Sequence, residues 1–85
     1  MKNFDYTITD EVGIHARPAG LLVKEAKKYE SKIVVKMGEK AAEATKLMAL
    51  MGMGVKKGDT VTVEVDGADE DAAVDGIKAF LESNF

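Results

Sequence analysis

The sequence predicts a small α+β fold in which one β-sheet carries helices on one face, with the elements in the order βαββαβα. Two segments alternate apolar and polar residues with the period of a strand, and two longer segments space their apolar residues with the period of a helix. A chain of 85 residues has room for a single hydrophobic core. We therefore expect residues 1–85 to form one domain of two packed layers.

The first half of the chain contains two predicted strands on either side of a helix. Over residues 3–8 every second residue is apolar, which predicts a strand with one buried face. After a loop, apolar residues recur with helical spacing from Ala16 to Tyr29. Pro18 suits the first turn of this helix, where a missing N–H costs nothing. The β-branched run at residues 33–37 predicts the second strand.

The second half adds two strands and two helices. Residues 38–40 favour a hairpin turn, and residues 40–44 predict a short third strand. Residues 47–51 predict a brief helix that ends at the glycines after it. Residues 60–66 alternate again and predict the fourth strand, and the acidic residues at 69–71 favour a helix N-terminus. The last helix is expected to bury a stripe made of Ala73, Val74, Ile77, Phe80 and Leu81.

Composition argues against several classes of function. The chain has no cysteine and one histidine, and the acidic residues at 66–71 lack the spacing of a calcium loop, so we expect no metal site and no cofactor. A net charge of −3 argues against a nucleic-acid partner. No apolar run approaches the ~18 residues of a membrane helix, so no membrane insertion is expected. The first residues lack a signal-peptide core, so the expected location is cytoplasmic.

Basic side chains are concentrated in the first half of the chain. Residues 1–40 carry eight basic against six acidic side chains, whereas residues 41–85 carry four against nine. An anionic ligand or an acidic partner is therefore expected on the side formed by the first half.

The single histidine, His15, lies where a loop becomes the first predicted helix. The first turn of a helix has free N–H groups and the positive end of the helix dipole. This environment disfavours the charged imidazolium, so the ring is expected to stay neutral and nucleophilic near pH 7. An anion attached to the ring would also lie among backbone donors, as anions at helix starts do.

Arg17 follows two residues later, and its guanidinium fork matches the oxygens of a phosphate group. His15 and Arg17 are therefore candidates for forming and holding a phosphorylated imidazole. The alternative is that His15 only caps the helix and that Arg17 is a solvated surface charge. Two neighbouring glycines favour the functional interpretation, because Gly13 frees the loop and Gly20 lets a partner approach the first turns closely.

The helix predicted at residues 47–51 is apolar on all sides. Leu50 can point to the core, but Leu47, Met48 and Met51 cannot all follow it. Exposed apolar groups and adaptable methionines are typical of partner surfaces, so we expect these three residues to form a docking patch. The alternative is a satellite hydrophobic cluster without a partner.

The residues from Gly13 to Ala19, Gly-Ile-His-Ala-Arg-Pro-Ala, closely resemble the active-site signature of the HPr family. These proteins are phosphocarriers of the bacterial phosphoenolpyruvate-dependent sugar phosphotransferase system. The resemblance extends over essentially the whole chain and includes residues 47–55 and 65–70. It implies an open-faced β-sandwich, with a four-stranded antiparallel sheet and three helices on one face.

The resemblance implies a phosphoryl relay instead of an enzyme with a small-molecule product. Enzyme I would transfer a phosphoryl group from phosphoenolpyruvate to His15, which would deliver it to the IIA domain of a sugar permease. The phosphoryl group would lie on Nδ1, bound at Ala16 and Arg17. The residues implied to contact the partners are Gly20, Lys24, Lys27, Leu47, Met48 and Met51.

The sequence departs from many Gram-positive relatives at one regulatory position. Those relatives carry a serine at the start of the second helix that a dedicated kinase phosphorylates, and here the position holds Lys46. An ammonium group cannot accept phosphate, so no regulatory serine is expected. Thr45 is either a substitute target or, as we expect, the N-cap of the short helix.

Two other functions are compatible with the same sequence features. A regulatory or interaction module of the same fold would bind partners without carrying phosphate, although family members of that kind lack the histidine. A carrier in a nitrogen-linked relay would use the same chemistry with other partners. In either relay, a shuttle passed between large proteins is expected to be a monomer.

Overall fold

The computed structural model describes residues 1–9 and 16–85. The elements follow the predicted order, and most boundaries lie within one residue of the predicted ones; the first helix is the exception, because it ends at Ala26 and leaves Tyr29 of the predicted helical pattern outside it. They are β1 (Lys2–Thr7), α1 (Ala16–Ala26), β2 (Lys32–Met37), β3 (Lys40–Glu43), α2 (Leu47–Gly52), β4 (Thr60–Asp66) and α3 (Glu70–Asn84).

The strands form one antiparallel sheet in the order β1-β4-β2-β3. β4 is central, and its Val63 lies opposite Phe4 of β1 on one side and Val35 of β2 on the other. The valines of β4 are buried, whereas the polar residues between them are partly exposed on the other face. The prediction that this strand has one buried and one solvated face is therefore confirmed.

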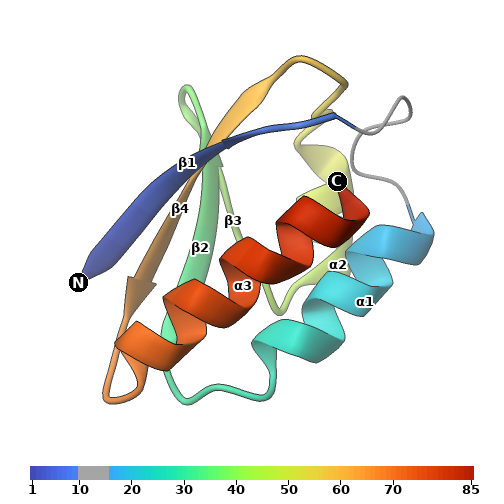
Figure 1. The fold of residues 1–85 in the computed structure, drawn as a ribbon. Helices are drawn as coiled ribbons and strands as arrows, with labels where there is room; N and C mark the ends of the chain where they lie inside the picture. Colours follow the sequence, from blue (N-terminus) through green and yellow to red (C-terminus); the bar gives the residue numbers. More distant parts are fainter. Residues whose placement is uncertain (10–15) are drawn as a thin grey trace.

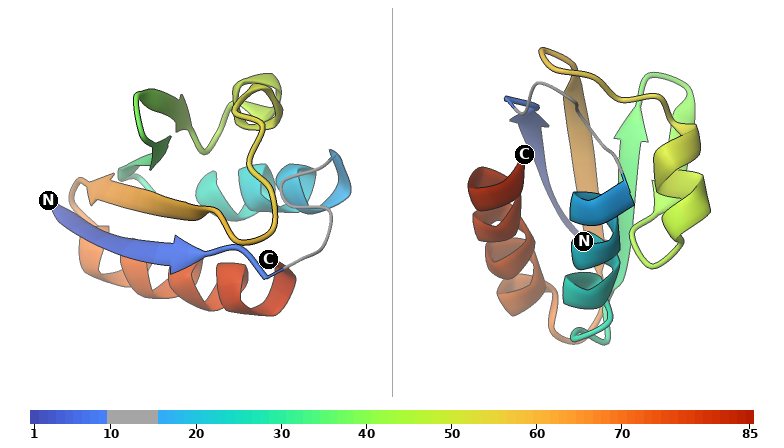
Figure 2. Two further views of the ribbon diagram at one scale, coloured as in Figure 1. Left: turned by 90° about the horizontal axis from the view of Figure 1, so that it is seen from above. Right: turned by 90° about the vertical axis from the view of Figure 1, so that its right-hand side faces the viewer.

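The helices cover one face of this sheet (Figure 1). α1 lies between α3 and α2 and contacts both (Figure 2). The hydrophobic core fills the space between the helices and the sheet, and one buried cluster includes Leu22 and Ala26 of α1 and Ile33 and Val35 of β2. The fold class implied by the resemblance, an open-faced β-sandwich, is confirmed.

The predicted apolar stripe of α3 is also confirmed. Three of its residues are buried, and Val74 and Phe80 are partly buried against the core. The pattern did not predict that Phe85, directly after α3, is also buried, with its ring centroid 6.4 Å from that of Phe80. The Thr9 hydroxyl donates a hydrogen bond to the Phe85 carbonyl at 2.8 Å. This bond joins the end of α3 to the last described residue before His15.

Tyr29, just beyond the end of α1, fixes the distance between α1 and α3. Its hydroxyl donates a hydrogen bond to the Glu25 carboxylate at 3.0 Å. Burial, followed by that carboxylate, raises the pKa of the Tyr29 hydroxyl. A Cβ atom at Gly76 of α3 would lie only 1.9 Å from Tyr29 Oη, so the ring fits because this helix position has no side chain.

A second polar contact joins the loop before β2 to the start of α3. The Asp69 carboxylate accepts hydrogen bonds from the Ser31 hydroxyl and from the backbone N–H groups of Glu30 and Ser31, both at 2.9 Å. Gly67 packs against the same loop, because a Cβ there would lie 2.6 Å from Ser31 Cα. The bond from the Ser31 hydroxyl is the main reason that the pKa of Asp69 lies below its ordinary value of 3.8.

The Asp69 contact predicts a specific loss of stability in acid. A carboxyl group with a lowered pKa in the folded state stabilises the fold above its unfolded pKa, and this contribution disappears as the pH falls toward the folded value. We therefore expect Asp69→Asn to lower the urea midpoint at pH 7, and the difference from wild type to shrink below about pH 3.5. Asp75→Asn, at an exposed position on the same helix, is the matched control and should show little change at either pH. An Asp69→Asn effect that is independent of pH would contradict this explanation.

Candidate functional site

The candidate phosphoryl acceptor, His15, lies outside the described residues. Ala16 is the first residue of α1, so the N–H groups of the first helical turn directly follow His15 in the chain. The first turn of α1 contains no acidic residue that would offset the positive end of its dipole. The prediction that a helix begins immediately after this histidine is confirmed.

The first turn of α1 is anchored on its inner side. Pro18 is buried and Ala19 is fully buried, whereas Arg17 is exposed. Because the two small residues hold the turn against the core, the guanidinium of Arg17 is presented to solvent at the end of the helix that follows His15. An exposed guanidinium at a helix N-terminus is well suited to bind an anion there.

The predicted contact residues Gly20 and Lys24 lie on α1, and Lys27 lies in the turn directly after it. Lys24 and Lys27 are exposed, and a Cβ atom at Gly20 would meet no atom within 4 Å, so the space beside this glycine is open. Sequence reasoning missed Leu21, which is 44% exposed, and Lys28, which is also exposed. The signal for Leu21 was available, because Leu21 and Leu22 are neighbours and only one of them can face the core.

The structure confirms that the short apolar helix α2 cannot bury all of its side chains. Leu50 is fully buried, whereas Leu47 is 36% exposed, Met51 is 37% exposed and Met48 is 79% exposed. α2 packs beside α1 (Figure 2). The docking patch and the basic residues of α1 therefore belong to neighbouring helices, with the apolar surface on one and the positive charge on the other.

The prediction that Thr45 caps α2 is wrong. The helix begins at Leu47, so Lys46 takes the N-cap position, and its carbonyl accepts the bond from the Leu50 N–H at 3.1 Å. No side chain forms a hydrogen bond at this cap. Thr45 lies one residue too early for its hydroxyl to act as the capping group.

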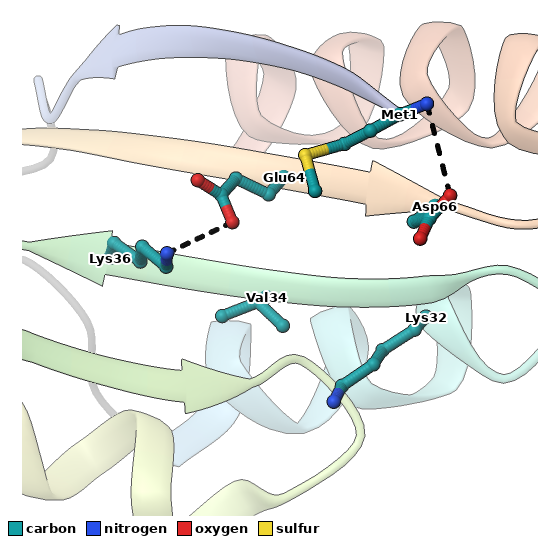
Figure 3. Close-up of a pocket in the computed structure, with 6 residues that line it drawn as sticks. All are labelled: Met1, Lys32, Val34, Lys36, Glu64 and Asp66. Atoms are coloured by element: carbon teal, nitrogen blue, oxygen red, sulfur yellow. Dashed lines mark ion pairs between the residues drawn. The ribbon is translucent and has the colours of Figure 1, made fainter.

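The open face of the sheet has a shallow hollow of about 370 Å³, drawn in Figure 3. Its charged groups are paired, some of them with residues outside the hollow. Lys36 Nζ lies 3.0 Å from a Glu64 carboxylate oxygen, and the Met1 amino group lies 2.9 Å from Glu70 and 3.8 Å from Asp66. Lys32 pairs with Glu43. The hollow lies on the face that the helices leave open, so it is separate from the docking patch. It is lined by Met1, Lys32, Val34, Lys36, Glu64 and Asp66.

In residues 1–9 and 16–85, no group of three or more His, Cys, Asp or Glu side chains is arranged to hold a metal ion. Over the same residues, every helix is too short or too polar to cross a membrane.

Known proteins that resemble this chain show the family to which it belongs. Residues 2–83 match the model of a family described as the PTS HPr component phosphorylation site. The chain is 44% identical to a phosphocarrier protein HPr of Mycoplasma capricolum, with 92% of this chain and 88% of the relative aligned. It is also 44% identical to a phosphocarrier protein HPr of Mycoplasma genitalium, with 99% and 97% aligned.

Solved structures agree with the sequence relatives. A crystal structure of HPr from Thermoanaerobacter tengcongensis superposes with a TM-score of 0.93 at 36% identity, covering 100% of this chain and 96% of that one. A structure of an HPr dimer from the same organism superposes with a TM-score of 0.77, covering 98% and 95%. On these matches, the chain belongs to the HPr family, the phosphocarrier proteins of the bacterial phosphotransferase system.

Proposed function

We propose that this protein carries a phosphoryl group on His15, accepting it from phosphorylated enzyme I and passing it to the IIA domains of sugar permeases. The observation that carries this proposal is the start of α1 directly after His15, with Arg17 exposed on its first turn. Free N–H groups, the positive end of the helix dipole and a guanidinium thus follow the only histidine of the sequence.

The chemistry requires a neutral imidazole with a free lone pair on Nδ1. That nitrogen attacks phosphorus in line with the bond to the donor, the new P–N bond forms, and the donor bond breaks. The backbone N–H groups at Ala16 and Arg17, together with the Arg17 guanidinium, bind the phosphoryl oxygens. The next acceptor then attacks the same phosphorus and releases His15 unchanged, so the protein is a carrier and not an enzyme.

The partner surface proposed for both transfers combines α1 and α2. The docking patch supplies apolar contact area, and Lys24 and Lys27 supply positive charge that attracts acidic partner surfaces and speeds their encounter. Gly20 leaves open space between these groups, which allows a partner to approach α1 closely. A shuttle of this kind acts as one cytoplasmic domain over residues 1–85, works as a monomer and needs no cofactor.

Phosphorylation of the wild-type protein tests this function. Incubation with enzyme I and phosphoenolpyruvate should add one phosphoryl group per chain, detected as a mass increase. The product should lose the group in acid and retain it in base, as a phosphohistidine does, and addition of a IIA domain should remove it. An acid-stable phosphate ester, or no phosphorylation of a folded protein, would contradict the proposal and favour the regulatory alternative.

A further inference from the structure

The position of α2 depends on contacts with the rest of the molecule. The helix has only six residues, so it is too short to be stable by itself. No side chain forms a hydrogen bond at its N-cap, and it has no basic residue in its last turn. The docking patch is therefore held in place by whatever binds α2 to the core and to the neighbouring strands.

The inner side of α2 is fixed by apolar packing. Leu50 is fully buried, and Met53 and Val55, in the segment that follows the helix, are almost fully buried. On the strand side, α2 contacts β3. Ala42 in β3 and Ala44 directly after it are buried, and these small residues leave room for the helix. This packing holds the helix against the sheet, and the carbonyl groups of Leu50 and Met51 accept backbone bonds from the N–H groups of Met53 and Gly54. The apolar packing gives no polar contact to the carbonyl of Met53 itself.

Lys40 provides that polar contact. Its Nζ donates a hydrogen bond at 3.3 Å to the carbonyl of Met53, the C-cap residue of α2. Two other lysines near the β2–β3 hairpin, Lys32 and Lys36, pair with carboxylates of neighbouring strands. An ammonium group at a helix C-terminus is favourable, because the carbonyl groups there carry partial negative charge.

We propose that Lys40 is a positioning residue for partner docking: by binding the C-cap carbonyl of α2, it fixes the docking patch relative to the basic residues of α1. This inference rests on the proposed function, because the patch needs a fixed position only if a partner binds α1 and α2 together. The effect of Lys40 is on the affinity for enzyme I and not on the transfer step at His15.

The test is a comparison of Lys40→Met with wild type as substrates of phosphorylated enzyme I. Methionine keeps most of the aliphatic length and removes the ammonium group. We expect KM to rise about 3–10-fold with kcat within about twofold, since one charge-assisted contact at a helix end is lost. Amide hydrogen exchange at Leu50 and Met53 should become faster, and Lys40→Arg should restore both measurements because arginine also donates to carbonyl groups. Lys32→Met is the matched control and should leave KM unchanged.

The outcomes separate this inference from the function on which it rests. A wild-type protein that accepts no phosphoryl group would overturn the proposed function and this inference together. Normal acceptance by wild type with an unchanged KM for Lys40→Met would overturn only the role of Lys40. The positioning role of Lys40 would also be overturned by a third result, in which the raised KM returns to the wild-type value in about 0.5 M salt and hydrogen exchange is unchanged. Lys40 would then act as a surface charge that attracts the partner.

Discussion

Replacing His15 with alanine is expected to reduce phosphoryl acceptance from enzyme I to background, a loss on the order of 10³-fold or more. Alanine has no lone pair that can attack phosphorus, and the chain has no other histidine or any cysteine to replace it. The measurement is the rate and the extent of phosphorylation by enzyme I and phosphoenolpyruvate, followed by mass. Circular dichroism and the urea midpoint, measured on the same sample, show whether the variant is folded and so separate loss of the acceptor from unfolding.

Two further variants show whether His15 or another residue accepts the phosphoryl group. Arg17→Ala should still accept phosphate but more slowly, by about 10–100-fold, because it loses one charge-assisted contact to the phosphoryl oxygens. Thr45→Val should behave as wild type, since Thr45 lies outside the proposed acceptor site. An acid-labile phosphate that persists in His15→Ala would show that the acceptor is another residue. An acid-stable phosphate in His15→Ala that is lost in the double variant with Thr45→Val would instead identify Thr45, because a threonine phosphate ester withstands acid.

The fold could be predicted from the sequence wherever the apolar pattern has a clear period. Residues 60–66 alternate strictly, and β4 occupies the same residues. Pro18 predicted where α1 begins because its ring is tolerated only in the first turn. The burial of Phe85 could not be predicted this way, because it depends on long-range contacts with Phe80 and Thr9 that no local period encodes.

In the candidate site, too, local patterns predicted some features, whereas others depend on the folded chain. The exposure of Met48 followed from a count of apolar residues on a two-turn helix, which has only one inner side. The cap of α2 was mispredicted because both Thr45 and Lys46 are compatible with a helix start, and a shift of one residue decides which is the N-cap. The bond from Lys40 to Met53 joins a strand to a helix 13 residues away, so only the folded chain reveals it.

The largest loss of stability is expected for Leu50→Ala. Leu50 is fully buried in the core cluster, and truncation of such a leucine removes apolar contacts and leaves a cavity. We expect the free energy of unfolding to fall by about 2–5 kcal/mol, measured by urea denaturation. If this variant does not fold, Leu50→Met, which conserves volume, should be folded and lose less than about 1.5 kcal/mol.

Leu47→Ala makes the same chemical change three residues earlier on the same helix. It should affect stability little and the KM with phosphorylated enzyme I clearly. Because Leu47 is 36% exposed and belongs to the docking patch, we expect a stability loss below about 1 kcal/mol and a several-fold higher KM with phosphorylated enzyme I. If Leu47→Ala instead costs as much stability as Leu50→Ala and leaves KM unchanged, the three residues of the docking patch are a satellite of the core. In that case the partner must dock elsewhere. The pair of variants therefore separates the two explanations of an apolar helix that the sequence alone leaves open.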